Sequence, residues 1–508
     1  MFAKVACFAL NGLEGIPVEA EVDMNNGLPA FEIVGLADAA VRESRERVRS
    51  AVKNSGRKFP SRKITVNLAP ADVRKEGSSF DLAVAVGILK ASEQLIADTD
   101  PYVFLGELSL DGGIRRVNGI LPVLISALKA GFTKFIVPKA NEREASFIDG
   151  ADVYACASLA EVVDHLTGVR PVPAGEKHSF ESAARAHRYD SDLSFVKGQA
   201  VAKRALEIAV SGGHNLLFIG PPGTGKTMLA RCIPTIMPEL TFKEALECTK
   251  IHSVAGVLDD ADGIVTLRPF RSPHHTATAV SLIGGGARYV KPGEISLAHN
   301  GVLFLDEIPE YGRAALESLR QPLEDGVISI SRVHSSITYP AAFMLCASMN
   351  PCPCGNLGSK DKVCTCSPAQ IARYKAKLSG PLLDRIDLQV EVDGVSYGEL
   401  SSRSREETSE TVRGRVNAVR EIQRRRFAED GIYTNAAMGE RQIEKYCRLS
   451  AECEKILRNA YETLKLSARA RSRIVKVART IADMEGSAEI SGAHILEAVS
   501  YRRADTHG

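Results

Sequence analysis

The sequence runs Leu216-Leu217-Phe218-Ile219-Gly220-Pro221-Pro222-Gly223-Thr224-Gly225-Lys226-Thr227 and continues with Met228-Leu229-Ala230. The first four residues predict a buried strand, the glycines a turn, and the last residues the start of a helix. The run from Gly220 to Thr227 matches the full phosphate-loop pattern in the strand–loop–helix context that the pattern requires. Its backbone N–H groups would converge on the phosphates of ATP. We expect Lys226 to reach the β- and γ-phosphates and the Thr227 hydroxyl to ligate Mg²⁺.

A second nucleotide-site signature follows about 80 residues later. Val302-Leu303-Phe304-Leu305 predicts an apolar strand, and Asp306-Glu307 come directly after it. Ligands of open α/β sheets bind at the carboxyl ends of the strands. We therefore expect Asp306 to hold Mg²⁺ and Glu307 to orient and polarise the attacking water. An acidic helix cap is the alternative, because Pro309 and Glu310 follow.

A third buried strand ends in a polar residue. The run Met344–Ser348 is apolar or small, and Met349-Asn350-Pro351 follow it. The Asn350 amide could hold the attacking water or the γ-phosphate. The alternative is a turn-forming Asn before Pro, which is a common pattern.

Length and composition suggest a soluble protein of about three domains. The chain has 508 residues, of which 44% are hydrophobic and 25% charged, with a formal net charge of +2. No apolar run approaches the roughly 20 residues that span a bilayer, and Met1–Gly15 lacks a signal-peptide pattern. We expect a cytoplasmic protein with no membrane partner and with reduced cysteines.

The chain divides into four segments by composition and pattern. Residues 1–170 alternate short apolar strands with helical patterns, which predicts an α+β domain. Residues 171–192 are polar and contain Pro and Gly, as linkers do. Residues 193–393 alternate strand, turn and helix, which predicts a parallel sheet. Residues 394–508 are helical, and the expected fold class is therefore α/β with a helical C-terminal lid.

The order of these motifs resembles that of an AAA+ ATPase. Leu382-Leu383-Asp384-Arg385-Ile386-Asp387 completes the series. The resemblance implies that Arg385 acts in trans on the nucleotide of a neighbouring subunit, in a ring that would be a homohexamer. A surface ion pair with Asp384 or Asp387 is the alternative. Arg469 matches the second sensor arginine of related ATPases, with Arg473 as the fallback.

Two inserts resemble those of the magnesium-chelatase and MCM-like helicase branch. One runs from Arg268 to Gly293, and the other, Gly326–Tyr339, predicts a β-hairpin. In that branch the inserts line the central pore. The resemblance implies sequence-independent, salt-sensitive contacts to DNA phosphates; the candidate residues are Arg268, Arg271 and Arg332.

The first domain resembles the proteolytic domain of Lon proteases. Ser79 matches the Lon nucleophile, but Leu121 stands where Lon carries its lysine. A Ser–Lys pair would therefore lack its base, and we expect no protease activity.

This domain order is similar to that of the YifB/ComM family. The resemblance implies an ATP-hydrolysing hexameric helicase that promotes branch migration of single-stranded or branched DNA during natural transformation. Residues 401–508 add modest support, with 17 Arg and 4 Lys against 16 acidic residues. The Arg424-Arg425-Arg426 run could bind phosphates or could form a solvated helix face paired with Glu neighbours.

Other classes of machine would share the ATP site. One is a chelatase motor subunit, against which the Lon-like domain argues, because chelatase ATPase subunits lack it. Others are a protein-remodelling machine and a nucleotide-dependent binding scaffold.

Four cysteines lie in one short loop as Cys352, Cys354, Cys364 and Cys366. Four thiolates could close a structural Zn²⁺ site, although zinc pairs are usually spaced C-x₂₋₄-C. Free thiols in a reducing compartment are the alternative.

Overall fold

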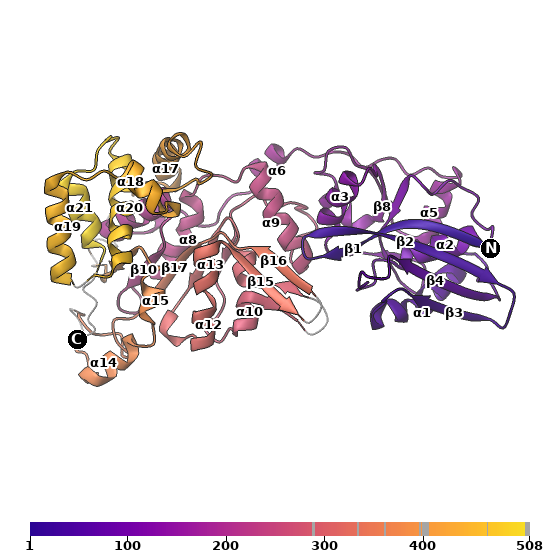
Figure 1. Ribbon diagram of the computed structural model, residues 1–508, viewed down its shortest axis with the longest axis horizontal. Helices are drawn as coiled ribbons and strands as arrows, with labels where there is room; N and C mark the ends of the chain where they lie inside the picture. Colours follow the sequence, from indigo (N-terminus) through magenta and orange to yellow (C-terminus); the bar gives the residue numbers. More distant parts are fainter. Residues whose placement is uncertain are drawn as a thin grey trace.

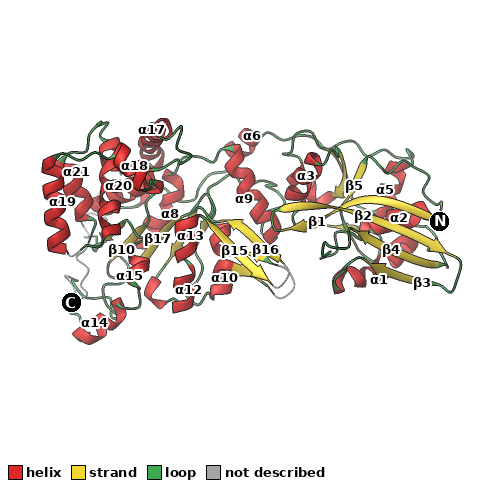
Figure 2. Cartoon of the chain, viewed as in Figure 1, coloured by secondary structure: helices red, strands yellow, loops and turns green. Residues whose placement is uncertain are grey.

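The computed structural model describes residues 1–286, 290–332, 335–359, 362–395, 398, 406–464 and 466–502. The molecule is elongated, with an N-terminal sheet at one end, a helical C-terminal region at the other and a second sheet between them (Figure 1). Figure 2 shows the change from strand-rich to helix-rich structure along this axis. Among the described residues, no helix combines the length and the apolar content needed to cross a bilayer.

The N-terminal sheet is mixed and has the order β3-β4-β2-β1-β5-β8-β9. Its strands are β1 (Phe2–Asn11), β2 (Glu14–Asn25), β3 (Ala30–Val34), β4 (Lys63–Ala69), β5 (Tyr102–Phe104), β8 (Lys134–Pro138) and β9 (Asp152–Cys156). β1 and β2 form an antiparallel hairpin, whereas β5, β8 and β9 run parallel to one another. The α1 (Ala39–Asn54), α2 (Asp81–Ala91), α3 (Ile120–Lys129) and α5 (Leu159–Leu166) helices complete the α+β domain.

The second sheet is parallel throughout and has the order β11-β14-β17-β10-β18. Its strands are β10 (Leu216–Ile219), β11 (Phe270–Arg271), β14 (Val302–Leu305), β17 (Met344–Met349) and β18 (Leu388–Glu391). Every residue of β10, β14 and β17 is buried, as expected for a parallel sheet covered on both faces. The predicted α/β class is confirmed, and the carboxyl ends of the three central strands meet at one edge.

Helices and a hairpin surround this sheet. The helices are α7 (Ala200–Gly212), α8 (Lys226–Ile236), α9 (Phe242–Ala255), α10 (Ala279–Ile283), α12 (Arg313–Ser318), α13 (Arg320–Asp325), α14 (Pro368–Lys375) and α15 (Gly380–Leu383). The β15 (Val327–Arg332) and β16 (Ser335–Pro340) strands pair antiparallel, from Val327 opposite Pro340 to Arg332 opposite Ser335. The hairpin expected over residues 326–339 is thus present.

The C-terminal helices share one core with the second sheet. They are α17 (Ser409–Arg426), α18 (Glu440–Tyr446), α19 (Ala451–Leu464), α20 (Ala468–Met484) and α21 (Gly492–Ser500). Val416 of α17 and Ile474 of α20 belong to the same buried cluster as Leu206 of α7 and Phe218 of β10. The charged α17 helix is held by a stripe of buried residues that includes Val412, Val416 and Val419.

The segment between the two sheets is more than a spacer. It contains α6 (Phe180–Ala186), and the Phe180 ring lies 5.7 Å from that of Phe242 at the start of α9. The N-terminal domain also touches α9, because the Gly119 N–H donates to the Ser253 hydroxyl at 3.0 Å. The polar composition of this segment predicted a linker but did not predict the helix α6. The apolar face of α6 is short, and its role becomes clear only from its packing against α9.

Candidate active site

The phosphate loop joins β10 to α8 in the predicted way. Gly223 and Gly225 have φ values of +79° and +87°, where a side chain would be strained. Gly220 is required for a different reason, since a Cβ there would lie 2.1 Å from the Val392 carbonyl oxygen after β18. The glycines therefore shape a loop whose N–H groups lead into the N-terminus of α8, a favourable place for phosphate.

The Lys226 side chain folds back onto this loop. Its ammonium donates to the carbonyl oxygens of Gly220 and Pro221, both at 2.7 Å, and contacts Asn350 Oδ1 at 3.4 Å. Burial lowers the pKa of Lys226, and the nearby Asp306 and Glu307 carboxylates act against that shift. The cation is thus held where the β- and γ-phosphates of a bound nucleotide would lie.

Thr227 and Asp306 fit a magnesium site. The Thr227 hydroxyl donates to Asp306 Oδ2 at 3.0 Å. Two ligands at about 2.1 Å from an octahedral Mg²⁺ are about 3 Å apart, and Mg²⁺ prefers such oxygen donors. The other Asp306 oxygen accepts from the Ser348 hydroxyl and from the Glu307 N–H. Ser348 was missed in the sequence, although a hydroxyl residue on the neighbouring strand was a usable signal.

Glu307 occupies a special backbone position. Its φ is +51°, unusual for a residue other than glycine, and its N–H donates to Ser348 Oγ at 3.2 Å. The side chain is 51% exposed, and a carboxylate oxygen lies 4.0 Å from His275 Nδ1. Glu307 is therefore open to solvent beside Asp306, and His275 brings the first insert to the same carboxylate.

A hollow of about 300 Å³ adjoins Thr227. Its walls come from α8 and from the end of the segment that precedes the sheet: Asp190, Ser191, Asp192, Phe195, Thr227, Met228, Arg231 and Cys232. Its place next to the phosphate loop suits the nucleoside end of ATP. Apart from Thr227, the sequence did not predict these residues, because Asp190–Phe195 carry no recognisable motif.

Arg385 lies just after α15 and is only 4% exposed. Its guanidinium donates to the Pro381 carbonyl at 2.6 Å and pairs with Glu324 of α13. Neither acidic neighbour in sequence is its partner, so the ion pair expected as the alternative is formed with a distant residue. To act on a neighbouring subunit, Arg385 would have to leave Glu324.

Arg469 and Arg473 differ in their surroundings. Arg473 pairs with the buried Asp387, whereas Arg469 at the start of α20 is 62% exposed and 3.9 Å from Glu324. Although burial opposes ionisation, Arg473 and then His214 lower the pKa of Asp387 well below its usual range. Arg473 is therefore tied into the core, and Arg469 is the better-placed candidate for the predicted sensor.

Two of the candidate DNA-binding residues, Arg268 and Arg271, have acidic partners within the chain. Arg268 is buried and donates to the Asn300 carbonyl at 2.7 Å and to Glu244 at 3.3 Å, so its predicted contact with DNA is corrected to an interior role. Arg271 forms a bidentate ion pair with Glu294, with N–O distances of 2.7 and 2.9 Å. The Arg332 backbone ends β15, and its side chain lies outside the described residues.

The arginines at the end of α17 favour the second of their two interpretations. Arg424 and Arg425 both pair with Glu421 of the same helix. Arg426 turns inward and pairs with Asp483. This stretch is thus a helix face with its own acidic partners.

Leu121 stands at the position where the Lon-like site would need its lysine. Leu121 of α3 is buried, and its N–H donates to Glu144 at 3.1 Å. The buried lysine nearest to Ser79 in the sequence is Lys75, which donates to the Pro70 carbonyl. The expectation of no protease activity remains a prediction.

The four loop cysteines come together after β17. Their Sγ atoms all lie within 4.8 Å of one another and could hold a metal ion. The other seven cysteines are buried singly, as small apolar residues are.

The fold and this site define an ATPase of the magnesium-chelatase AAA+ class. Residues 192–400 match the family model described as magnesium chelatase, subunit ChlI, and residues 406–502 match the ChlI C-terminal model. Residues 20–141 match the model described as subunit ChlI of Mg-chelatase.

Comparison with curated relatives identifies the family within this class of ATPase. The chain is 45% identical to "Competence protein ComM" of Haemophilus influenzae, over 97% of this chain and 95% of the relative. It is 46% identical to "Uncharacterized protein YifB" of Escherichia coli, over 97% and 96%. "Lon protease 2" of Bacillus subtilis is 27% identical over 28% of this chain and 26% of its own length. The chain belongs to the YifB/ComM family.

Proposed function

We propose that this protein is a cytoplasmic, homohexameric motor that couples ATP hydrolysis to movement on single-stranded or branched DNA. Its role would be ComM-like branch migration in recombination and natural transformation. The observation that carries the proposal is the near full-length similarity to a competence protein. The arrangement of Lys226, Asp306, Glu307 and Asn350 at one sheet edge supports an ATP- and Mg²⁺-dependent activity.

Arg385 would complete the site of the neighbouring subunit. Glu324, its partner, lies near the end of α13, and β15 of the hairpin begins three residues later. Release of Arg385 to a γ-phosphate would therefore free the residue that leads into the hairpin. This connection supports a ring in which ATP turnover moves the hairpin against DNA phosphates, with Arg271 and Arg332 as candidate contacts.

The ring makes a prediction about mixed subunits. Arg385→Ala should abolish ATP turnover, because an arginine finger contributes about 10³-fold or more. Lys226→Ala should also abolish it, because it removes the cation expected at the β- and γ-phosphates. Mixed in one ring, an intact Lys226 site can face an intact Arg385, so ATPase activity should partly return. The measurement is the ATPase rate of an equimolar mixture after subunit exchange. A mixture as inactive as its components would refute action in trans.

DNA stimulation tests the motor itself. We expect single-stranded DNA or a four-way junction to raise the steady-state ATPase rate, and higher salt to remove the stimulation. Glu307→Gln serves as the blank. Stimulation by unfolded polypeptide instead of DNA would favour the protein-remodelling alternative.

A chelatase motor is the second candidate function. All three matching family models carry a chelatase description, including the model for residues 20–141. The sequence analysis expected the first domain to argue against a chelatase subunit, but a domain with a chelatase description does not separate the two functions. This candidate predicts an ATPase rate that is indifferent to DNA at every salt concentration.

A further inference from the structure

The loop between β17 and α14 has the geometry of a metal site. Cys352 Sγ lies 3.4 Å from Cys354 Sγ and 3.7 Å from Cys364 Sγ, and the last two sulfurs are 3.7 Å apart. Cys366 completes a set within 4.8 Å. We propose that these four thiolates bind one structural Zn²⁺, which fixes the loop against the phosphate loop.

The sulfurs of Cys352, Cys354 and Cys364 are spaced as one face of a tetrahedron around zinc would require. Four thiolates at about 2.3 Å from a central Zn²⁺ are about 3.8 Å apart. The three separations, 3.4 to 3.7 Å, are close to this edge length and far longer than the roughly 2 Å bond of a disulfide. The irregular C-x-C spacing is accommodated because the pairs come from the two ends of a folded loop, 10 residues apart at Cys354 and Cys364.

The loop around the sulfurs is built to face them. Gly355 has a φ of +78°, and its N–H donates to the Cys352 carbonyl at 3.0 Å, which closes a tight turn. The Leu357 N–H points at Cys352 Sγ, 3.4 Å away. Four thiolates leave no open position on the ion, so its role is structural rather than catalytic.

The position of the loop gives the metal a consequence. A Cβ on Gly355 would lie 2.6 Å from Pro222 Cδ, so the loop packs directly on the phosphate loop. Asn350, two residues before Cys352, contacts the Lys226 ammonium. An ion that closes the loop would therefore hold both Pro222 and Asn350. This consequence rests on the assigned ATP site, whereas the metal itself does not.

The first experiment measures metal in untagged protein purified without chelators. We expect about one zinc per chain by elemental analysis, retained on dialysis and released when a mercurial blocks the thiols. Cys354→Ser should lower the zinc content at least several-fold, and Cys447→Ala, a buried cysteine of the helical region, should leave it unchanged. Less than about 0.1 metal per chain, or iron in place of zinc, would overturn the proposal.

Cobalt gives a second measurement that does not depend on a variant folding. Refilling the chelated full-length protein with Co²⁺ should give the absorption of tetrahedral thiolate cobalt, and one equivalent of Zn²⁺ should remove it. Absorption typical of octahedral cobalt would contradict a four-sulfur site.

The link to the ATP site is tested separately with Gly355→Ala. This change leaves all four ligands, but it strains the turn at Gly355 and pushes the loop away from Pro222, so zinc content is measured on the same sample. In protein that retains its zinc, we expect at least several-fold weaker ATP binding. Removal of zinc from the unmodified protein should weaken ATP binding in the same direction. If zinc is present but neither change alters ATP affinity, the metal does not position the nucleotide site.

Discussion

Glu307→Gln is expected to lower the rate of ATP hydrolysis by a factor of about 10² to 10⁴, the usual contribution of a general base. The amide keeps the size of the side chain but cannot polarise a water molecule. ATP should still bind, because Lys226 keeps its bond to the Gly220 carbonyl and Thr227 keeps its bond to Asp306. The measurement is the steady-state ATPase rate, with binding of a fluorescent nucleotide followed in parallel.

Glu310→Gln is the matched control. Glu310 lies three residues further on and pairs with Lys377 at 3.0 Å on the surface. Its change should leave both turnover and ATP binding near those of the unmodified protein. Equal loss in the two variants, or full activity of Glu307→Gln, would remove Glu307 from its assigned role.

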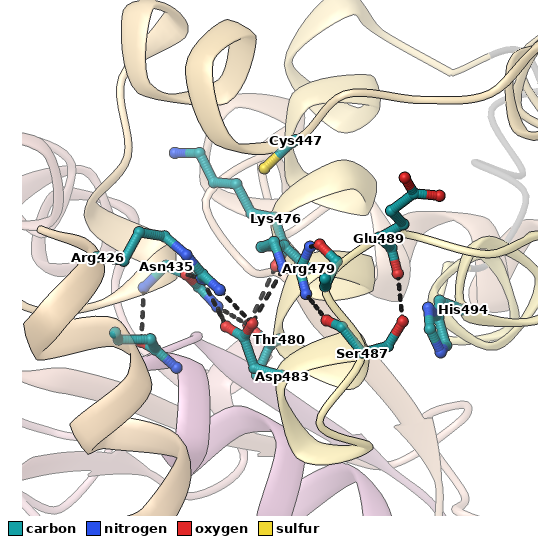
Figure 3. A network of polar contacts seen from close by, with 12 residues as sticks. Arg426, Asn435, Cys447, Lys476, Arg479, Thr480, Asp483, Ser487, Glu489 and His494 are labelled. Atoms are coloured by element: carbon teal, nitrogen blue, oxygen red, sulfur yellow. Dashed lines mark hydrogen bonds and ion pairs between the residues drawn. The ribbon is translucent and has the colours of Figure 1, made fainter.

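Asp483→Ala is expected to destabilise the protein by about 3 to 5 kcal/mol, the cost of removing one partner of a buried ion pair. Asp483 accepts from Arg426 at 2.7 Å, from Arg479 at 3.0 Å and from Asn435 at 2.8 Å (Figure 3). Arg479 is 2% exposed, so the substitution leaves a buried guanidinium without its carboxylate. Because the helices share a core with the ATPase sheet, we expect a lower midpoint for the thermal transition of both.

Glu421→Ala provides the comparison for this loss. Glu421 also pairs with two arginines, Arg424 and Arg425, but both are well exposed. Exposed helix pairs contribute about 0.5 kcal/mol or less, so its midpoint should hardly move. Two variants with the same shift in midpoint would show that burial does not set the strength of the Asp483 network.

The motifs of the ATP site could be recognised in the sequence because each is a short, continuous run of residues with a characteristic pattern. A buried strand followed by Gly220–Thr227, or by Asp306-Glu307, predicts the local structure and the chemistry together. The alternation of Val18, Ala20, Val22 and Met24 with polar residues is an equally local signal and indicates the strand β2.

Long-range partners lie outside any such pattern. No local feature pairs Arg385 with Glu324, brings Ser348 to Asp306, or places the Asp190–Phe195 segment beside Thr227. Arg268 was assigned to DNA from its place in an insert, but the fold buries it against Glu244. The charge of a side chain is visible in the sequence, whereas its burial depends on the segments packed around it.

The sequence by itself determined the class of protein, because the spacing of glycine, lysine, hydroxyl and carboxylate residues is set by backbone geometry within a few residues. Only the tertiary structure decided which of the many arginines face inward, and it alone brought four thiols at two ends of a loop to within reach of one ion. The physical reason is the range of the interactions. Hydrogen bonds within a turn depend on neighbouring residues, whereas desolvation and ion pairing depend on residues that meet only when the chain is folded.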